Sequence, residues 1–238
     1  MSPVLLKARP VVRARQAVSP GPEAAPRRSA GRSAAQRIGI LGGTFDPPHI
    51  GHLWLAVLAA DQLSLDRVLF MPASQPPHKR NRRTSSITDR LLMTRLAIAG
   101  NPALELSTIE VNRPGPSFTI DSIEELLTAY RGARLFLLMA GDSLAKIDAW
   151  REPDRLLSLV EWAVAPRPGS VAPDATALGQ RFGPAARRIH LLDGPALDVS
   201  ATDIRHRVAA GRTIRYLVPQ AVEEMILDRG LYRRTRPR

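Results

Sequence analysis

The 238-residue sequence contains no cysteine. Disulfide bonds, thiolate metal sites and a cysteine nucleophile are therefore excluded, and the absence fits a reducing compartment. Its longest apolar runs, such as LWLAVLAA, fall far short of the roughly 20 residues that a membrane-spanning helix needs. We therefore expect a soluble, cytoplasmic protein that has no membrane partner.

Acidic residues are scarce at both ends of the chain. Residues 1–37 carry eight Lys or Arg and one Glu, and residues 233–238 carry four Arg and no acidic residue. Residues 38–232 hold 22 basic and 21 acidic side chains, so the net charge of +12 lies mainly in the tails. A near-neutral core is a poor surface for nucleic acid, and we expect no nucleic-acid partner.

The composition divides the chain into three parts. Residues 1–36 are rich in Pro, Ala, Ser and Arg without periodicity, which predicts a disordered basic extension. An organellar transit peptide or a translation start placed too early are alternatives, although the prolines oppose the amphipathic helix of a transit peptide. Residues 37–232 are predicted to form one α/β domain, followed by a basic tail over residues 233–238.

The chain is organised around the segment RIGILGGTFDPPHIGHL, residues 37–53. Its apolar start predicts a short buried strand, and Gly42 and Gly43 permit a sharp turn where a ligand can approach the backbone. From Ile50 the apolar spacing is helical, so His49 and His52 are expected on one face of the first turn. Two imidazoles would then lie at a helix N-terminus.

This arrangement suits a phosphate group. Free N–H groups and the positive end of the helix dipole attract an anion, and imidazole donors can follow charge as it moves between phosphate oxygens. The segment contains neither G-x-x-x-x-G-K-[ST] nor G-x-G-x-x-G, which weighs against kinases and dehydrogenases. The alternative for His49 and His52 alone is a pair of ordinary surface histidines.

The sequence GGTFDPPHIGH resembles the signature of the H-x-G-H nucleotidyltransferases, specifically that of the bacterial nicotinate-nucleotide adenylyltransferase family. The resemblance extends from about Arg37 to Tyr232. It implies that the two histidines contact the phosphates of ATP and stabilise the transferring α-phosphate. The ATP-binding residues that it implies in this segment are Gly42, Gly43, Thr44, Phe45, His49 and His52.

A second anion site is predicted in VSATDIRHRV, where Ser200 or Thr202 can cap a helix and Arg205 lies one turn further on. The segment is similar to the family motif I-S-[ST]-T-x-I-R, which completes the triphosphate site. Ala201 replaces the middle hydroxyl residue. The resemblance implies that Ser200, Thr202 and Arg205 bind ATP and that Arg205 is catalytic together with His49 and His52.

The segment RPGPSFT precedes a predicted helix that either Thr119 or Asp121 could cap. It resembles the family motif R-x-G-x-S-Y-T, whose Thr and neighbouring amides bind the nicotinate carboxylate, so Thr119 is the implied substrate-binding residue. Phe118 replaces the tyrosine of the motif. Any hydrogen bond from a phenol is therefore lost at this position.

Three further residues are candidates for substrate binding. Asp142 follows Gly141 at a strand end, and both are candidate ATP-binding residues. The Asp142 carboxylate can accept ribose hydroxyls of either substrate or instead cap a helix. Trp150 matches a family tryptophan that stacks on the pyridine ring, with simple burial against the next helix as the alternative. Lys79 lies in a basic loop, and PPHK resembles a family element that reaches substrate phosphates; a solvated charge cluster is its alternative.

Predicted strands alternate with helices, and several strands end at candidate site residues. This order predicts a Rossmann-like, doubly wound parallel sheet in a single nucleotidyltransferase domain. The remaining strands are expected at Asp66–Pro72, Leu104–Val111, Arg134–Ala140, Glu161–Ala165, Ile189–Leu192 and Leu197–Val199.

The resemblance implies transfer of AMP from ATP to nicotinate mononucleotide, a step of NAD biosynthesis that yields nicotinate adenine dinucleotide and pyrophosphate. Mg²⁺ is expected to arrive on ATP, and no metal site on the protein is expected. A phosphopantetheine adenylyltransferase is the alternative enzyme, although RPGPSFT and Trp150 have no purpose there. A basic nucleic-acid-binding module is the alternative that is not an enzyme. The sequence does not indicate whether the protein is a monomer or an oligomer.

Overall fold

The computed structural model describes residues 35–75, 84–166, 168–169 and 174–233. Six strands form one sheet in the order β3-β2-β1-β4-β5-β6, and all neighbouring strands are parallel. The strands are β1 (Arg37–Gly43), β2 (Arg67–Pro72), β3 (Leu104–Leu106), β4 (Arg134–Ala140), β5 (Glu161–Ala165) and β6 (Ile189–Leu191).

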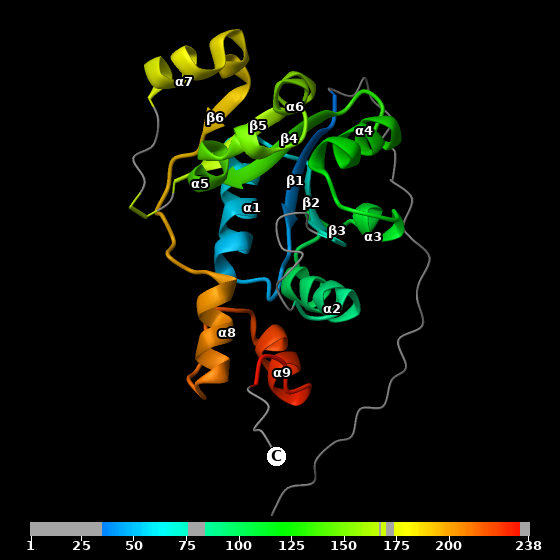
Figure 1. The fold of residues 1–238 in the computed structure, drawn as a ribbon, viewed down its shortest axis with the longest axis vertical. Coiled ribbons are helices and arrows are strands. Elements are labelled where there is room, and N and C mark those ends of the chain that lie inside the picture. Colours follow the sequence, from blue (N-terminus) through cyan, green and yellow to red (C-terminus); the bar gives the residue numbers. More distant parts are fainter. Residues whose placement is uncertain (1–34, 76–83, 167, 170–173, 234–238) are drawn as a thin grey trace, which may run out of the picture. The chain divides into compact units, whose positions relative to one another are not determined.

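Helices connect these strands along the chain (Figure 1). The α-helices are α1 (Ile50–Gln62), α2 (Ile87–Ile98), α3 (Ile109–Asn112), α4 (Thr119–Ala129), α5 (Gly141–Ala145), α6 (Pro153–Leu159), α7 (Ala175–Phe182), α8 (Ala201–Ala209) and α9 (Gln220–Asp228). Two 3₁₀ helices are η2 (Ile147–Ala149) and η3 (Gly183–Arg188). No helix among the described residues is long and apolar enough to cross a membrane.

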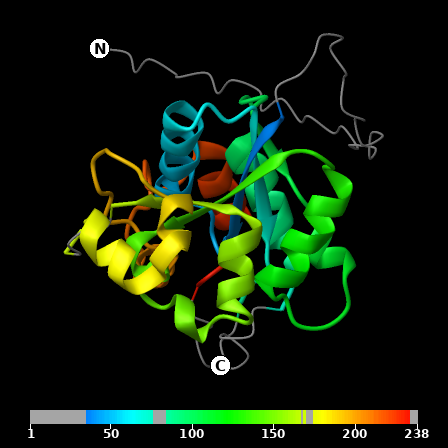
Figure 2. The same ribbon diagram turned by 90° about the horizontal axis from the view of Figure 1, so that it is seen from above.

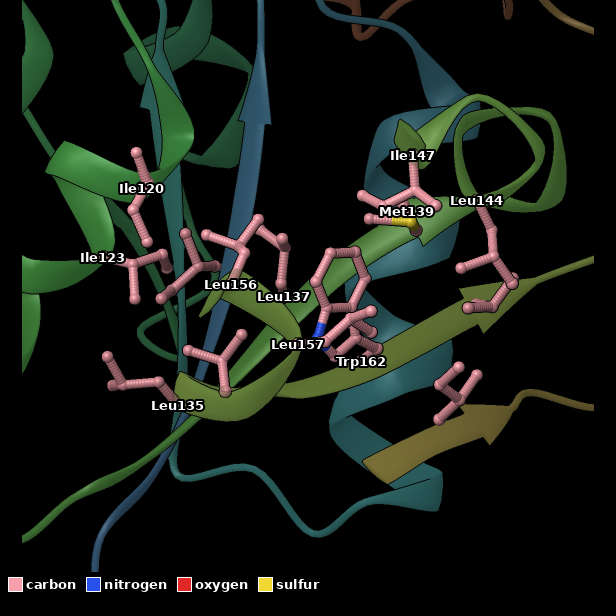
Figure 3. Close-up of a cluster of buried hydrophobic side chains, with 14 of the residues drawn as sticks. Ile120, Ile123, Leu135, Leu137, Met139, Leu144, Ile147, Leu156, Leu157 and Trp162 are labelled. Carbon is pink, nitrogen blue, oxygen red and sulfur yellow. The ribbon is translucent and has the colours of Figure 1, made fainter. Parts of the chain in front are cut away.

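Both faces of the sheet are buried because side chains along a strand alternate between them. In β4, Leu135, Leu137 and Met139 join one hydrophobic cluster, whereas Phe136 and Leu138 join another. The first cluster, shown in Figure 3, also contains residues of α4, α5 and α6 and the buried Trp162 of β5. The second is closed by α1, and Figure 2 shows α1 and α4 on opposite sides of the strands.

A third cluster joins α2, α8 and α9 and includes Met93, Ile204 and Ile226. Figure 1 shows α8 and α9 close together near the carboxyl end of β1. The chain builds β1, β2 and β3 in one direction and then β4, β5 and β6 in the other. The order of strands therefore reverses between β1 and β4, which is where doubly wound sheets bind ligands.

The predicted doubly wound parallel sheet is confirmed, but several local predictions are wrong. Gly42 and Gly43, which were expected in a turn, are the last two residues of β1 and pair with β2. The strand expected over Leu104–Val111 ends at Leu106, because α3 begins at Ile109 and buries Glu110. Leu197–Val199 is not a strand, since Leu197 and Val199 instead line the cavity described below. Neither predicted residue caps α4, because the extended Phe118 precedes the helix and Thr119 is already its first residue.

Candidate active site

A cavity of about 730 Å³ opens at the carboxyl ends of β1 and β4, between the starts of α1, α4, α5 and α8. Its volume is typical of a small-molecule site. Most of the candidate residues line it: Gly42, Gly43, Thr44, Phe45, His49, His52, Thr119, Asp142, Trp150, Ser200, Thr202 and Arg205. Gly141, the first residue of α5, is not among the described lining residues. Lys79 lies outside the described part of the chain.

The turn between β1 and α1 is shaped by Phe45. Its backbone is in the left-handed region at φ +48°, and its side chain is 1% exposed. The ring packs on Phe70 and against the edge of His52, with centroid distances of 5.6 and 4.9 Å. A Cβ at Gly43 would come within 3.1 Å of the Phe45 ring, so the second glycine leaves room for this aromatic support.

His49 and His52 lie together at the start of α1. His49 is the N-cap rather than a residue of the first turn, and the two ring centroids are 3.7 Å apart with 31° between the ring planes. A Cβ at Gly51 would lie 3.1 Å from His49 Nδ1, which explains the glycine between the two histidines. The short side chain lets the His49 ring lie against the helix.

A hydrogen bond sets the tautomer of His52. The His49 backbone N–H donates to His52 Nδ1 at 3.1 Å, so a neutral His52 ring carries its proton on Nε2 and has a donor there. The Ile50 N–H donates to the Leu217 carbonyl at 3.0 Å and is not available to an anion. The anion site predicted at α1 therefore depends more on the imidazoles and the helix dipole than on this amide.

The second phosphate segment meets the first through Arg205. Ser200 caps α8, since its Oγ accepts a hydrogen bond from the Asp203 N–H at 3.1 Å. Arg205 Nη2 donates to Thr202 Oγ1 at 3.2 Å, and Nη1 donates to the Asp46 carbonyl at 2.7 Å. The two segments are 159 positions apart at this last contact, yet they face one cavity.

The RPGPSFT loop is fixed to the loop that follows β2. Ser117 Oγ accepts a hydrogen bond from the Ser74 N–H at 3.0 Å, and the Ser117 N–H donates to the Gln75 carbonyl at 3.1 Å. Thr119 lines the cavity two residues later. Sequence reasoning missed this role of Ser117, although a small hydroxyl residue in a loop rich in Pro and Gly is a signal for such a contact.

Asp142 and Trp150 line the cavity beyond β4. Asp142 is the second residue of α5 and Ala140 is its N-cap, so the alternative role of Asp142 as a helix cap is excluded. Trp150 is half-buried, and its ring centroid lies 6.3 Å from that of the fully buried Trp162. The indole is thus supported from the core while part of it stays accessible.

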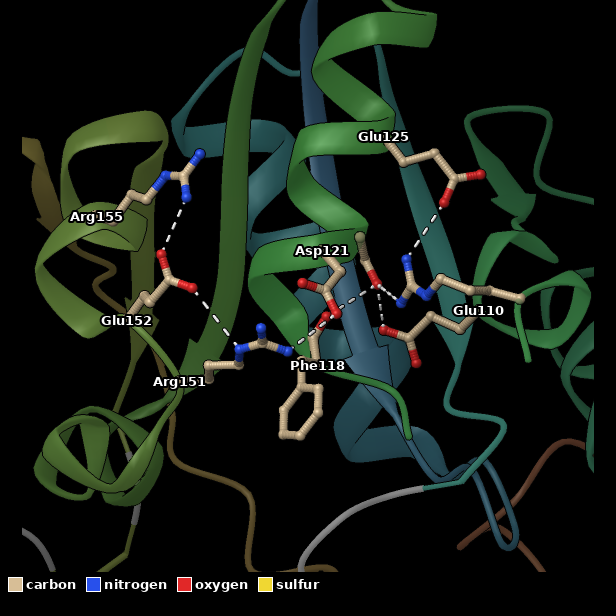
Figure 4. Close-up of polar contacts among 9 residues, drawn as sticks. Glu110, Phe118, Asp121, Glu125, Arg151, Glu152 and Arg155 are labelled. Atoms are coloured by element: carbon tan, nitrogen blue, oxygen red, sulfur yellow. Dashed lines mark hydrogen bonds and ion pairs between the residues drawn. The ribbon is translucent and has the colours of Figure 1, made fainter. Parts of the chain in front are cut away.

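Ionic contacts connect the loop that carries Trp150 to the start of α4 (Figure 4). The Arg151 guanidinium lies 4.8 Å from the centroid of the Phe118 ring and 3.6 Å from Asp121. On the other side it is 3.7 Å from Glu152. Phe118, although it lacks a phenol, therefore gives Arg151 an aromatic surface that links the two walls on which Trp150 and Thr119 lie.

Two charged residues that the sequence did not mark as part of the site are buried behind the β1–α1 turn. Asp46 and Arg90 are each 2% exposed. Arg90 donates to the carbonyls of Thr44 at 3.0 Å, Ala73 at 2.7 Å and Ser74 at 3.2 Å. Burial lowers the pKa of Arg90 below its ordinary value, and the negative charge of Asp46 opposes that shift. In the sequence Arg90 is an ordinary charged residue of a helix and gives no signal of burial.

No group of three or more His, Cys, Asp or Glu side chains in the described ranges is arranged to hold a metal ion. The basic groups that line the cavity are His49, His52, Arg205 and His206. They suit a polyanionic ligand.

A model of the cytidylyltransferase-like family matches residues 40–207. A protein of Thermomicrobium roseum, named as a probable nicotinate-nucleotide adenylyltransferase, is 48% identical over 197 residues, covering 83% of this chain and 92% of the relative. A protein of the same name from Roseiflexus sp. is 47% identical over 196 residues, covering 82% and 98%. The chain belongs to the nicotinate-nucleotide adenylyltransferase family. The resemblance in the sequence is thereby confirmed.

Solved structures of this family share the fold. Nicotinic acid mononucleotide adenylyltransferase of Plasmodium falciparum, complexed with NaAD, superposes with a TM-score of 0.70 at 16% identity. The alignment covers 83% of this chain and 97% of that one. The same protein complexed with APC gives a TM-score of 0.68. At this level of identity the likeness establishes the fold alone.

Proposed function

We propose that this protein transfers AMP from ATP to nicotinate mononucleotide, giving nicotinate adenine dinucleotide and pyrophosphate in NAD biosynthesis. The observation that carries the proposal is the contact between the two phosphate segments, where Arg205 of α8 bonds the Asp46 carbonyl at 2.7 Å beside the two histidines. Membership of the family supports it, as do the names of the relatives.

The reaction needs alignment and charge stabilisation rather than a covalent intermediate. A phosphate oxygen of the mononucleotide, already ionised at neutral pH, attacks the α-phosphorus of ATP. The bond from this phosphorus to the oxygen that bridges to the β-phosphate breaks, and pyrophosphate leaves with the electron pair. His49, His52 and Arg205 are proposed to bind the phosphate oxygens as charge moves toward the leaving group. The Nε2–H of His52 is a suitable donor.

The two substrates are proposed to bind on opposite sides of these groups. The end of β1 at Gly42 and Gly43, the following turn of Thr44 and Phe45, and the start of α8 bind ATP, with Ser200 and Thr202 at its phosphates. Trp150 stacks on the pyridine ring, Thr119 binds its carboxylate, and Asp142 accepts ribose hydroxyls. The binding of ATP by Gly141 stays a prediction. The proposed contact of Lys79 with a substrate phosphate stays a prediction.

Magnesium is proposed to reach the site on the phosphates of ATP, since hard oxygen ligands suit this ion. Residues 37–232 are proposed as the catalytic domain, with the basic extension over residues 1–36 and the tail over residues 233–238 outside it. A cytoplasmic location and the lack of a nucleic-acid partner stay predictions.

Steady-state rates with three acceptors test the proposal. Nicotinate mononucleotide, its amide and phosphopantetheine are each offered with ATP, and release of pyrophosphate is measured. We expect the acid to be preferred, because an amide places its NH₂ against donors at Thr119 and leaves them unpaired, at about 1–3 kcal/mol per buried group. Equal kcat/KM for acid and amide would remove the role of Thr119, and preference for phosphopantetheine would contradict the proposed function.

A further inference from the structure

The last described aromatic residue, Tyr232, reaches the turn that carries the histidines. Its hydroxyl donates a hydrogen bond of 2.7 Å to Asp46 Oδ1. The other oxygen of the same carboxylate, Oδ2, accepts the Ser85 N–H at 3.2 Å. Asp46 is 2% exposed, so these contacts replace water around a buried carboxylate. The C-terminal segment thus supplies a partner to a residue within GGTFDPPHIGH.

The backbone around Asp46 connects its buried carboxylate with the phosphate site. Its carbonyl accepts the 2.7 Å hydrogen bond from Arg205, and its peptide precedes the Pro-Pro corner that leads to His49. Arg90 binds the Thr44 carbonyl two residues earlier. A shift of Asp46 would therefore move both the Arg205 guanidinium and the backbone that sets the histidine pair.

Tyr232 is held firmly in the position that this bond requires. Its backbone is left-handed at φ +64°, which a tyrosine adopts only where surrounding contacts impose it. The preceding Leu231 N–H donates to the Ile226 carbonyl at 3.0 Å, and both Leu231 and Tyr232 pack against the third cluster. Burial raises the pKa of Tyr232, so the phenol stays protonated and is a donor at neutral pH. Met93 Sδ, at 3.7 Å, is a much weaker acceptor than the carboxylate.

We propose that Tyr232 is a positioning residue for adenylyl transfer, which acts through its hydrogen bond to Asp46 to fix His49, His52 and Arg205 relative to one another. The proposal rests on the proposed function. Tyr232 is not among the described residues that line the cavity, so it acts through Asp46 and touches no substrate. A small displacement of catalytic groups can lower a rate by about a hundredfold, which makes such a distant bond matter.

Tyr232→Phe in the full chain removes the hydroxyl and keeps the ring. We expect kcat to fall about tenfold to a hundredfold while KM for ATP changes less than about threefold, since positioning affects the transition state more than substrate binding. Tyr216→Phe is the matched control, because Tyr216 is 82% exposed, and its kcat should equal that of the wild type. Ile226→Val controls for weakened packing of α9 and should also keep its kcat.

Asp46→Ala, which removes the acceptor, and the double variant complete a mutant cycle. If the two side chains act through their bond, Tyr232→Phe in the Asp46→Ala background should lower kcat by less than about twofold. The ¹⁵N resonances of the His52 ring provide a readout independent of turnover and should shift in Tyr232→Phe but not in Ile226→Val. Wild-type kcat and unchanged His52 resonances in Tyr232→Phe would overturn the proposal, whereas a wild type inactive on nicotinate mononucleotide would overturn only the proposed function.

Discussion

The amino ends of the strands, here called the amino edge of the sheet, and their carboxyl ends, the carboxyl edge, carry the same kinds of side chain but use them differently. At the amino edge, Arg134 and His190 bind the carboxylate of Glu161 at 3.0 and 2.9 Å, and the Arg37 guanidinium lies 4.6 Å from the Phe136 ring centroid. These groups satisfy one another. At the carboxyl edge, His52 and Arg205 instead contact backbone groups, and both side chains line the cavity.

This comparison shows that the function of a charged side chain depends more on the groups it contacts than on its residue type. Arg134 is half exposed and pairs with an acid, whereas the two hydrogen bonds described for Arg205 are donated to a carbonyl and a hydroxyl beside the cavity. An arginine held by neutral acceptors can still attract an anion. Substitutions at the amino edge are therefore expected to affect stability, and substitutions at the carboxyl edge are expected to affect turnover.

The largest effect is expected for His52→Ala. Loss of one preorganised donor typically lowers kcat by roughly 100- to 1000-fold, and KM for ATP should change much less because the contact strengthens in the transition state. His190→Ala is the matched control at the other edge and should keep its kcat. A folded His52→Ala enzyme that retains more than about a third of the wild-type kcat would remove His52 from the mechanism.

An intermediate effect is expected for Trp150→Ala. Stacking of a base on an aromatic ring contributes about 1–3 kcal/mol, which corresponds to a rise of about 5- to 150-fold in KM for nicotinate mononucleotide. KM for ATP is the internal control and should stay nearly constant, since Trp150 is proposed to contact only the mononucleotide. Equal increases in both KM values would indicate a general disturbance of the cavity and would contradict stacking.

The smallest effect is expected for Glu161→Gln. Burial raises the pKa of Glu161, but hydrogen bonds from His190 and Arg134 outweigh it and bring the pKa below its ordinary 4.5. The ionised form is thus stabilised by folding, so its contribution is present above pH 4.5 and is lost as pH falls through the lowered value.

At neutral pH the free energy of unfolding of Glu161→Gln should be lower by roughly 0.2–1 kcal/mol, as for other partly exposed ion pairs, with kcat unchanged. Denaturant titrations at pH 7 and near pH 3 measure the difference between the variant and the wild type, which should narrow in acid. A difference in the free energy of unfolding that grows in acid would contradict the stabilising role of the Glu161 carboxylate. A large fall in kcat would contradict the assignment of turnover to the carboxyl edge alone.

The sequence predicted what depends on local patterns. Apolar runs gave β2, β4 and β5 to within a residue, because strands buried on both faces read as continuous hydrophobic segments. The cap of α8 at Ser200 was among the predicted alternatives. The strand expected over Leu104–Val111 was too long, since the burial of Glu110 depends on its hydrogen bond to Ser122 of a later helix.

The supporting groups of the site could not be read from local patterns. Arg90 and Tyr232 are placed by contacts to residues 46 and 186 positions away, and neither stands in a distinctive sequence context. The Ile50 N–H is likewise not available to an anion because it donates to the distant Leu217 carbonyl. Contacts that join remote segments are decided by packing, which periodicity and propensity do not report.

A crystal structure of the protein with nicotinate adenine dinucleotide tests the central claim most directly. We expect the pyrophosphate bridge of the dinucleotide between His52 and Arg205, with the pyridine ring against Trp150 and its carboxylate at Thr119. The amino edge around Glu161 should be unchanged. A dinucleotide bound away from the carboxyl edge, or bound there with its adenine rather than its pyridine ring on Trp150, would contradict the account.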